Sequence, residues 1–192
     1  MRRFAVIGHL AKTDGTFPLD DLPGSAGRMD LLCRCVQTAF FLSHTLRRDV
    51  ECYLILCGAP VPPKTILIKG DEVRYLNPDE RSTAALLRKA LALPAGREFR
   101  QSTTGIYIRA AGLEAFLTEH QIALADEGGE DLRHIPTIPM TFLLSDHLNL
   151  TDEERALVGD CPRFSVSPRS LHADHVITLI HNELDRRDVG WT

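Results

Sequence analysis

The segment FSVSPRSLHADH, residues 164–175, decides how the C-terminal third of the chain folds. The residues around it predict a strand over 163–167 and a final helix over 171–186, joined by a turn that contains Pro168. At such a turn the backbone groups are released from the strand ladder, so they are available to hydrogen-bond a planar heterocycle such as adenine. The segment therefore predicts a strand–turn–helix unit whose turn can bind a ligand.

A second apolar segment, FLLSDH at residues 142–147, predicts a buried strand over 137–144 that ends abruptly in small and ionisable residues. In α/β sheets, ligands bind beyond the carboxyl ends of the strands. Ser145, Asp146 and His147 are therefore candidate pocket residues. Asp146 and His147 fit a catalytic role, and Asp146 fits equally well a structural role in which its carboxylate accepts hydrogen bonds from loop amides.

Strand and helix patterns alternate along the rest of the chain, without repeats or long linkers. This alternation predicts one α/β domain over residues 1–192, with a mainly parallel sheet flanked by helices. The predicted strands cover residues 3–8, 50–57, 105–109 and 121–125, with a hairpin formed by 65–69 and 72–76. The predicted helices cover about residues 27–46, 77–93, 112–119 and 151–157, the last capped by Thr151.

Length and composition are those of an ordinary globular domain: 192 residues, 44% hydrophobic and 25% charged, with a formal net charge of −4. No apolar run approaches the roughly 20 residues that span a bilayer, and residues 3–8 are typical of a first strand and not of a signal peptide. We therefore expect a cytoplasmic protein without membrane contact. The negative charge excludes a global basic field of the kind many nucleic-acid binders carry, but not a local patch.

Five cysteines, an odd number, do not suggest a disulfide framework in a cytoplasmic chain. Cys33 and Cys35 lie in a strongly helical segment, where side chains two residues apart point about 200° away from each other. The two thiols are therefore poorly placed to share a metal ion, and we expect them to be buried structural residues.

The segment DLPGSAGRMD, residues 21–30, leads into the long helix predicted from about residue 27. Its two glycines permit sharp turns, and Ser25 is a candidate N-cap. The segment places Arg28 and Asp30 at the start of a rigid helix. Arg28 is suited to bind a phosphate, and Asp30 to orient a base or to receive its proton. A capped helix with a surface Arg–Asp pair explains the same pattern without any function.

The common nucleotide-binding and hydrolase fingerprints are missing from the sequence: it has no Rossmann or P-loop glycine pattern and no Gly-x-Ser-x-Gly elbow. His172 and His175 share a helix face at a spacing of three residues, and Asp146 is a possible third ligand from another loop. These residues make a zinc-dependent hydrolase an alternative. Their spacing is not that of the His-Glu-x-x-His motif, so we predict no metal site.

Taken together, the three segments resemble the TrmY-type pseudouridine N1-methyltransferases of the SPOUT class. The resemblance runs in order along almost the whole chain, and jointly its motifs are highly specific. It is carried by residues 21–36 (DLPGSxGRxDLLCRCV), 39–44 (AFFLSH), 47–50 (RRDV), 78–81 (PDER), 101–107 (QSTxGIY) and 166–185. The chain departs from archaeal members at Ser145, where they usually carry Gly, and at Thr104, where they usually carry Pro.

The resemblance implies an α/β SPOUT fold with a C-terminal trefoil knot, the knot and cofactor site lying in about residues 120–192, and a homodimer as the working unit. It also implies that S-adenosyl-L-methionine is bound in the knot loops and that its methyl group goes to N1 of pseudouridine in RNA, namely tRNA. Carried over by motif, the cofactor contacts are Leu124, Ser145, Val166, Ser167, Pro168, Arg169, Ser170, Leu171 and Val176.

The implied reaction requires a proton to leave N1 of pseudouridine, and an acceptor near that atom would accelerate transfer. Asp30 and Asp146 are the candidates, with Asp30 ahead because it lies beside Arg28 in the matched segment. The candidate phosphate ligands are Arg28, Arg47, Arg48, Arg81 and Arg109. A third possible function, besides the methyltransferase and the zinc hydrolase, is a cofactor- or RNA-binding module that has lost catalysis.

Overall fold

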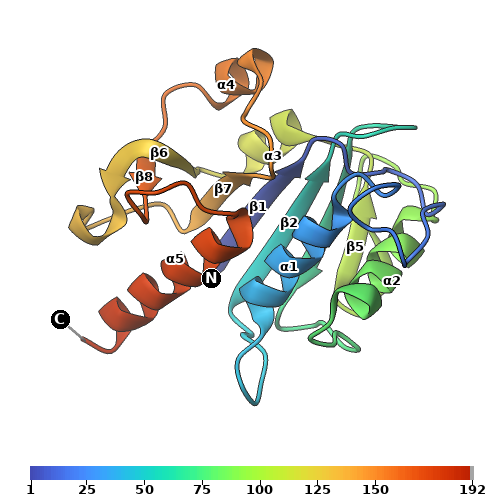
Figure 1. The fold of residues 1–192 in the computed structure, drawn as a ribbon, viewed down its shortest axis with the longest axis horizontal. Coiled ribbons are helices and arrows are strands. Elements are labelled where there is room, and N and C mark those ends of the chain that lie inside the picture. The colour runs from blue at the N-terminus through green and yellow to red at the C-terminus, as the bar shows by residue number, and fades with distance from the viewer. Residues whose placement is uncertain (191–192) are drawn as a thin grey trace.

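The computed structural model describes residues 1–190, which form one eight-stranded sheet with helices on both faces (Figure 1). Residues 191 and 192, at the end of the predicted domain, lie outside the described residues. The strand order is β4-β5-β3-β2-β1-β7-β6-β8. The strands are β1 (Arg2–Gly8), β2 (Val50–Leu56), β3 (Lys64–Lys69), β4 (Arg100–Thr103), β5 (Ile106–Arg109), β6 (Ala123–Asp131), β7 (Thr141–Ser145) and β8 (Arg163–Ser165).

The sheet is parallel in one half and antiparallel in the other. Strands β2, β1, β7, β6 and β8 are parallel neighbours, whereas β3, β5 and β4 continue the sheet in antiparallel pairs. The predicted mainly parallel sheet is therefore confirmed only for the half that contains the central strand β1. In that half the carboxyl ends of β7, β6 and β8 lie at one edge, which is where a ligand pocket is expected.

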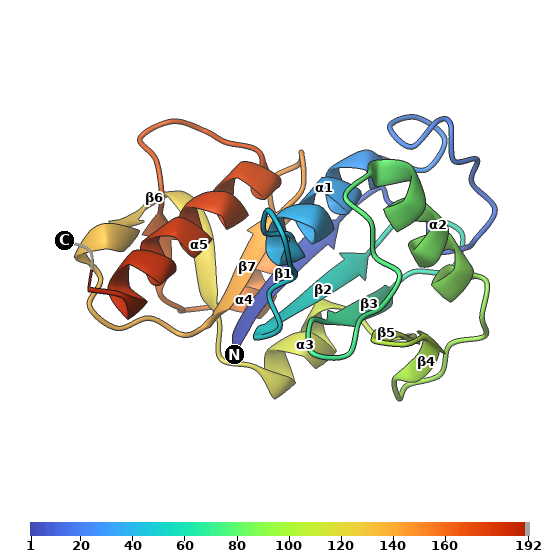
Figure 2. The same cartoon turned by 90° about the horizontal axis from the view of Figure 1, so that it is seen from below.

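Two separate apolar cores cover the faces of the sheet. Side chains of β1 alternate between them: Phe4 and Val6 face one core, and Ala5 and Ile7 face the other. Helices α1 (Met29–Phe40), α2 (Glu80–Leu91) and α5 (Ala173–Asp188) cover the first face, and α3 (Leu113–Glu119) and α4 (Asp152–Val158) lie on the second (Figure 2). The helices flanking the sheet on both sides confirm the predicted layers.

Helix α1 begins later and ends earlier than predicted. Its N-cap is Arg28, in a left-handed conformation with φ 64°, and no side chain caps the helix. The predicted cap Ser25 instead donates its hydroxyl to the carbonyl of Asp21 within the preceding turn, at 3.0 Å. After Phe40 the chain turns back on itself, with Leu42 N–H donating to the carbonyl of Thr45 at 2.9 Å. Arg47 N–H also donates to the carbonyl of Phe40 at 2.7 Å, and these two backbone bonds close a turn that ends the helix before residue 46.

The predicted hairpin of residues 65–69 and 72–76 does not form. Residues 72–76 are a turn, in which Val73 N–H donates to the carbonyl of Lys69 at 2.8 Å. Strand β3 instead pairs with β5, about forty positions later, because the apolar face of Ile66 and Ile68 is completed by Ile106 and Ile108. Strand β4 is polar and lies at the sheet edge, so hydrophobic periodicity gave no signal for it.

Helix α4 confirms the predicted cap. The hydroxyl of Thr151 accepts from Glu154 N–H, and the carboxylate of Glu154 accepts from Thr151 N–H, which together form a capping box. Cys33 and Cys35 are buried and unpaired, as expected. Within residues 1–190, no helix is long and apolar enough to cross a membrane.

Candidate active site

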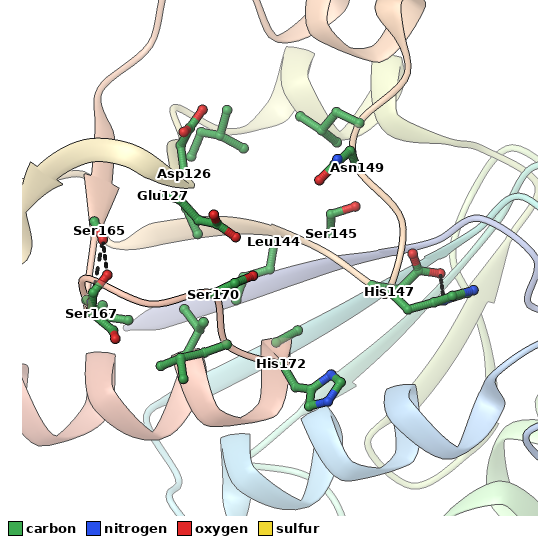
Figure 3. Close-up of a pocket in the computed structure, with 18 of the residues that line it drawn as sticks. Asp126, Glu127, Leu144, Ser145, His147, Asn149, Ser165, Ser167, Ser170 and His172 are labelled. Carbon is green, nitrogen blue, oxygen red and sulfur yellow. Dashed lines mark hydrogen bonds and ion pairs between the residues drawn. The ribbon is translucent and has the colours of Figure 1, made fainter.

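A cavity of about 610 Å³ lies beyond the carboxyl ends of β7 and β8 and beside the first half of β6 (Figure 3). This is within the range of about 300–1,000 Å³ that small-molecule sites occupy. Its lining comes from the ends of β7 and β8, the first half of β6, the β7–α4 loop (residues 146–151) and the turn between β8 and α5. The lining residues are 124–127, 144–150, Arg155, 164–167, 169–173 and Val176.

The cavity brings together eight of the nine predicted cofactor contacts: Leu124, Ser145, Val166, Ser167, Arg169, Ser170, Leu171 and Val176. The ninth, Pro168, is exposed and is not among the lining residues. These residues come from β6, β7, the β8–α5 turn and the first turn of α5, which are far apart in sequence. Parallel pairing of β6 with β7 and β8 places them at one edge.

Serine side chains shape the turn between β8 and α5. The hydroxyl of Ser165 donates to the carbonyl of Ser167 at 2.8 Å, and Arg169 N–H donates to the hydroxyl of Ser167 at 3.0 Å. Within the described residues, no backbone–backbone hydrogen bond involves residues 168–171. Apart from Arg169 N–H, which is bound by Ser167, the main-chain groups of residues 168–171 are therefore available to a ligand.

Asp146 lies at the cavity edge, but its carboxylate is committed to the protein. Oδ1 accepts from the imidazole Nδ1 of His9 at 2.8 Å and from Leu148 N–H at 2.9 Å, and Oδ2 accepts from His9 N–H at 2.9 Å. Burial opposes ionisation of Asp146, but these hydrogen bonds outweigh it and hold its pKa below the usual value. Only 1% of the side chain is exposed, and both oxygens already accept hydrogen bonds from the protein.

The other two predicted catalytic residues lie outside the cavity. Arg28 donates through Nε and Nη2 to both oxygens of Asp30, at 3.0 and 3.2 Å, and Arg34 donates to Asp30 at 3.1 Å. Burial raises the pKa of Asp30 less than the two guanidinium groups lower it, so the pKa is below its usual value. Nε of Arg34 also lies 3.5 Å from Asp174, one residue after the cavity-lining Ala173, so this cluster adjoins the cavity edge.

Three of the predicted phosphate ligands serve the fold. Arg47 and Arg109 form ion pairs with carboxylates of α5 and α3, and Arg48 donates to backbone carbonyls that follow β3. Arg28 is 30% exposed beside Asp30, and Arg81 is exposed at the start of α2. Only these two of the five fit the role the sequence suggested.

The zinc site of the alternative hydrolase is not formed. The rings of His172 and His175 are 6.0 Å apart, and the proposed third ligand Asp146 is held by His9. Within residues 1–190, no group of three or more histidine, cysteine, aspartate and glutamate side chains is placed to hold a metal ion. The structure thus offers no support for metal-dependent hydrolysis by these residues.

Several cavity residues were not predicted. Asp126 and Glu127 follow the end of the predicted strand 121–125, and Figure 3 shows them on the side of the cavity opposite Asn149. The structure places them inside β6, at the point where its register with β8 shifts between Ala125 and Glu130, so the predicted strand end at residue 125 marks this irregularity. Carboxylates at this position are suited to bind a ribose, because they can accept hydrogen bonds that the ribose hydroxyls donate.

A family model described as a putative SAM-dependent RNA methyltransferase matches residues 1–189. The chain belongs to this family. Among individual members, the tRNA (pseudouridine(54)-N(1))-methyltransferase of Methanocorpusculum labreanum is 52% identical over 97% of this chain and 98% of its own length. That of Methanospirillum hungatei is 49% identical over the full length of both chains.

The fold of this RNA methyltransferase also matches a solved structure, Archaeoglobus fulgidus Nep1 bound to S-adenosylhomocysteine. The TM-score is 0.66 at 16% identity, over 98% of this chain and 100% of that one. The match confirms the predicted α/β fold, a sheet flanked by helices, for this member of the RNA methyltransferase family.

Proposed function

We propose that this RNA methyltransferase transfers the methyl group of S-adenosylmethionine to N1 of pseudouridine 54 in tRNA, as the names of its relatives describe for them. The observation that carries the proposal is the cavity, since its strand-end position, its volume and its main-chain turn suit an adenosine. Leu124, Leu171 and Val176 offer apolar surface to a planar base. Asp126 and Glu127 are suited to accept hydrogen bonds from the ribose hydroxyls.

When bound, the cofactor supplies an activated methyl group on a sulfonium centre. The protein's part is to hold that group and the attacking nitrogen in line, and orientation of this kind is worth about 7–11 kcal/mol. The β8–α5 turn and the ends of β6 and β7 fix the cavity on one rigid sheet edge. We assign orientation to these elements, with Arg28 and Arg81 as contacts for the RNA phosphates.

We assign neither Asp30 nor Asp146, the two predicted proton acceptors, to removing the proton from N1. Both oxygens of Asp30 bind guanidinium groups, and a carboxylate with a lowered pKa is a weak base. We assign Asp30 to positioning Arg28 and Arg34, and Asp146 to positioning the β7–α4 loop. The proton at N1 then leaves to water or to an RNA group.

A homodimer and the knot belong to the same proposal. Leu148 and Leu171 line the cavity and are 41% and 36% exposed, which suits an apolar contact with a second copy at the cavity rim. The knot, proposed for about residues 120–192, is supported by β8 lying at the sheet edge while α5 returns to pack on α1. With a tRNA substrate, we also propose a cytoplasmic location.

The function is tested with two tRNA transcripts that differ only at position 54, one with pseudouridine and one with uridine. Radiolabelled methyl is expected to enter only the pseudouridine transcript, because N1 of uridine carries the sugar and cannot be methylated. Calorimetry with S-adenosylhomocysteine is run in parallel. Equal labelling of both transcripts would contradict the proposed target, and cofactor binding without any labelling would indicate a module that has lost catalysis.

Replacing Asp30 by asparagine tests the positioning role. We expect S-adenosylhomocysteine affinity to stay within about twofold, because Asp30 does not line the cavity, and KM for tRNA to rise by about tenfold or more as Arg28 and Arg34 lose their shared anion. Steady-state kinetics and calorimetry measure both, with Asp71→Asn as a charge-matched surface control. A lower kcat at unchanged KM, together with a lost pH dependence, would instead restore Asp30 as the proton acceptor.

A further inference from the structure

His9 directly follows β1 and lies between two carboxylates. Its Nδ1 is 2.8 Å from Asp146 Oδ1, and its Nε2 is 3.0 Å from Glu154 Oε2. All three side chains are largely buried, with 9%, 1% and 14% of their surface exposed. Since ionised carboxylates only accept hydrogen bonds, both ring nitrogens must donate, and only the imidazolium form of histidine can do so.

The surroundings of His9 favour the charged ring. The hydrogen bond with Asp146 has the largest effect, and together with that of Glu154 it outweighs burial and raises the pKa of His9 to about 8. The other ionisable groups near this cluster are His147, whose Nδ1 is 3.4 Å from Asp146, and Cys57 at the end of β2. Burial raises the pKa of the Cys57 thiol to about 11, so it stays neutral.

The two carboxylates stand at the two ends of one cavity wall. Asp146 begins the β7–α4 loop and accepts from Leu148 N–H, while Glu154 closes it by accepting from Thr151 N–H at 2.8 Å. Between these anchors, residues 147–150 line the cavity. Figure 1 shows α4 standing away from the sheet, so His9 links this loop and helix to the end of the central strand.

We propose that His9 is a positioning residue for the cofactor: as an imidazolium it fastens both ends of the β7–α4 loop to β1 and holds this cavity wall in its binding shape. The inference rests on the proposed function, since it concerns the same cavity. It also gives Asp146 a role that its buried position permits, because the carboxylate acts on the wall and not on the substrate.

The sign of the pH effect follows from the direction of the shift. A histidine whose pKa rises from 6.5 to about 8 in the ordered wall stabilises that wall fully below pH 6.5. The contribution is lost as the pH rises through about 8. The difference between the two pKa values limits the change in the ordering equilibrium to about thirtyfold.

The experiment compares wild type with His9→Gln by calorimetry, using S-adenosylhomocysteine from pH 6 to 9.5. The ratio of the two dissociation constants is the readout, because titration of the ligand's own amino group cancels in it. We expect His9→Gln to bind about tenfold more weakly at pH 6 and the ratio to approach one above pH 9. His44→Gln, an exposed histidine in the turn after α1, is the matched control and should follow wild type at every pH.

A ratio near one at pH 6 would overturn the positioning role, and so would a ratio that does not change with pH. If wild type itself does not bind S-adenosylhomocysteine, the proposed function fails first. Glu154→Gln is the alternative variant if His9→Gln does not fold. Glutamine can still accept the hydrogen bond from Thr151 N–H, but it removes one negative charge beside His9. Its affinity is expected to decline at a lower pH than that of wild type, and an unshifted profile would contradict the proposal.

Discussion

Replacing Ser145 by tryptophan is expected to weaken S-adenosylhomocysteine binding by at least about a hundredfold, or roughly 2.7 kcal/mol, and to abolish methyl transfer. Ser145 ends β7, lines the cavity and is half-buried, and its hydroxyl donates to the carbonyl of Leu148, another residue of the cavity wall. An indole there occupies volume that an adenosine needs. The backbone of β7 cannot shift to make room, because β7 is hydrogen-bonded to β1 on one side and to β6 on the other.

Calorimetry and a methylation assay on pseudouridine-containing tRNA measure the effect, and thermal unfolding checks that the variant folds. Ser43→Trp adds the same indole to an exposed residue in the turn after α1 and should bind S-adenosylhomocysteine like wild type. If Ser145→Trp folds and still binds with wild-type affinity, the cofactor is not in this cavity, and the assignment of all nine contact residues falls with it.

The parallel half of the fold and its ligand edge were predictable because they depend on local pattern. Of the predicted strands over residues 137–144 and 163–167, the structure forms β7 at Thr141–Ser145 and β8 at Arg163–Ser165, and each has its carboxyl end at the cavity. Parallel strands align these ends, so residues after different strands meet without any knowledge of distant contacts. The same rule, applied to the predicted strand end at residue 125, points to Asp126 and Glu127, although β6 continues past a register shift to Asp131.

The remaining features depend on partners that lie far away in the sequence. His9 follows a strand and belongs to no sequence motif. Its partners Asp146 and Glu154 lie 137 and 145 positions later in the chain. The prediction of the antiparallel half failed for the same reason, because β3 pairs with β5 and not with the adjacent segment 72–76. Local propensity cannot rank such pairings, since tertiary packing decides between them.

Asp30 and Asp146 illustrate a different limit. The sequence shows that a carboxylate stands near a predicted ligand edge, but it does not show which of its oxygens are already bound. The structure gives each of them at least two hydrogen-bond donors and a lowered pKa. The sequence motif alone therefore cannot decide between a catalytic and a positioning role for these carboxylates, and the hydrogen bonds of the structure favour positioning.

Gly27→Ala is expected to lower the free energy of unfolding by at least about 3 kcal/mol. Gly27 has φ 66°, a left-handed conformation that costs a residue with a side chain about 1–2 kcal/mol. A Cβ at this position would also lie 1.8 Å from the carbonyl oxygen of Leu10. That oxygen is backbone, so the clash is relieved only by separating the loop from the segment after β1.

The separation would also disturb the start of α1. Next to Gly27, Arg28 N–H and Met29 N–H donate to the carbonyls of Pro23 and Leu22, at 3.2 and 3.1 Å, and these bonds hold the left-handed Arg28 beside Asp30. We therefore expect KM for tRNA to rise in any fraction of Gly27→Ala that remains folded, while S-adenosylhomocysteine binding is less affected.

Chemical denaturation of Gly27→Ala against Gly96→Ala measures the stability loss. Gly96 is exposed, and a Cβ there meets nothing within 4 Å, so alanine should be neutral or stabilise by less than about 1 kcal/mol through the unfolded chain. The two variants make the same chemical change, and only the backbone conformation and the nearby carbonyl differ. Equal stability of the pair would mean that the loop before α1 yields easily, and a loop that yields could not hold Arg28 in the fixed position we assign to it for tRNA binding.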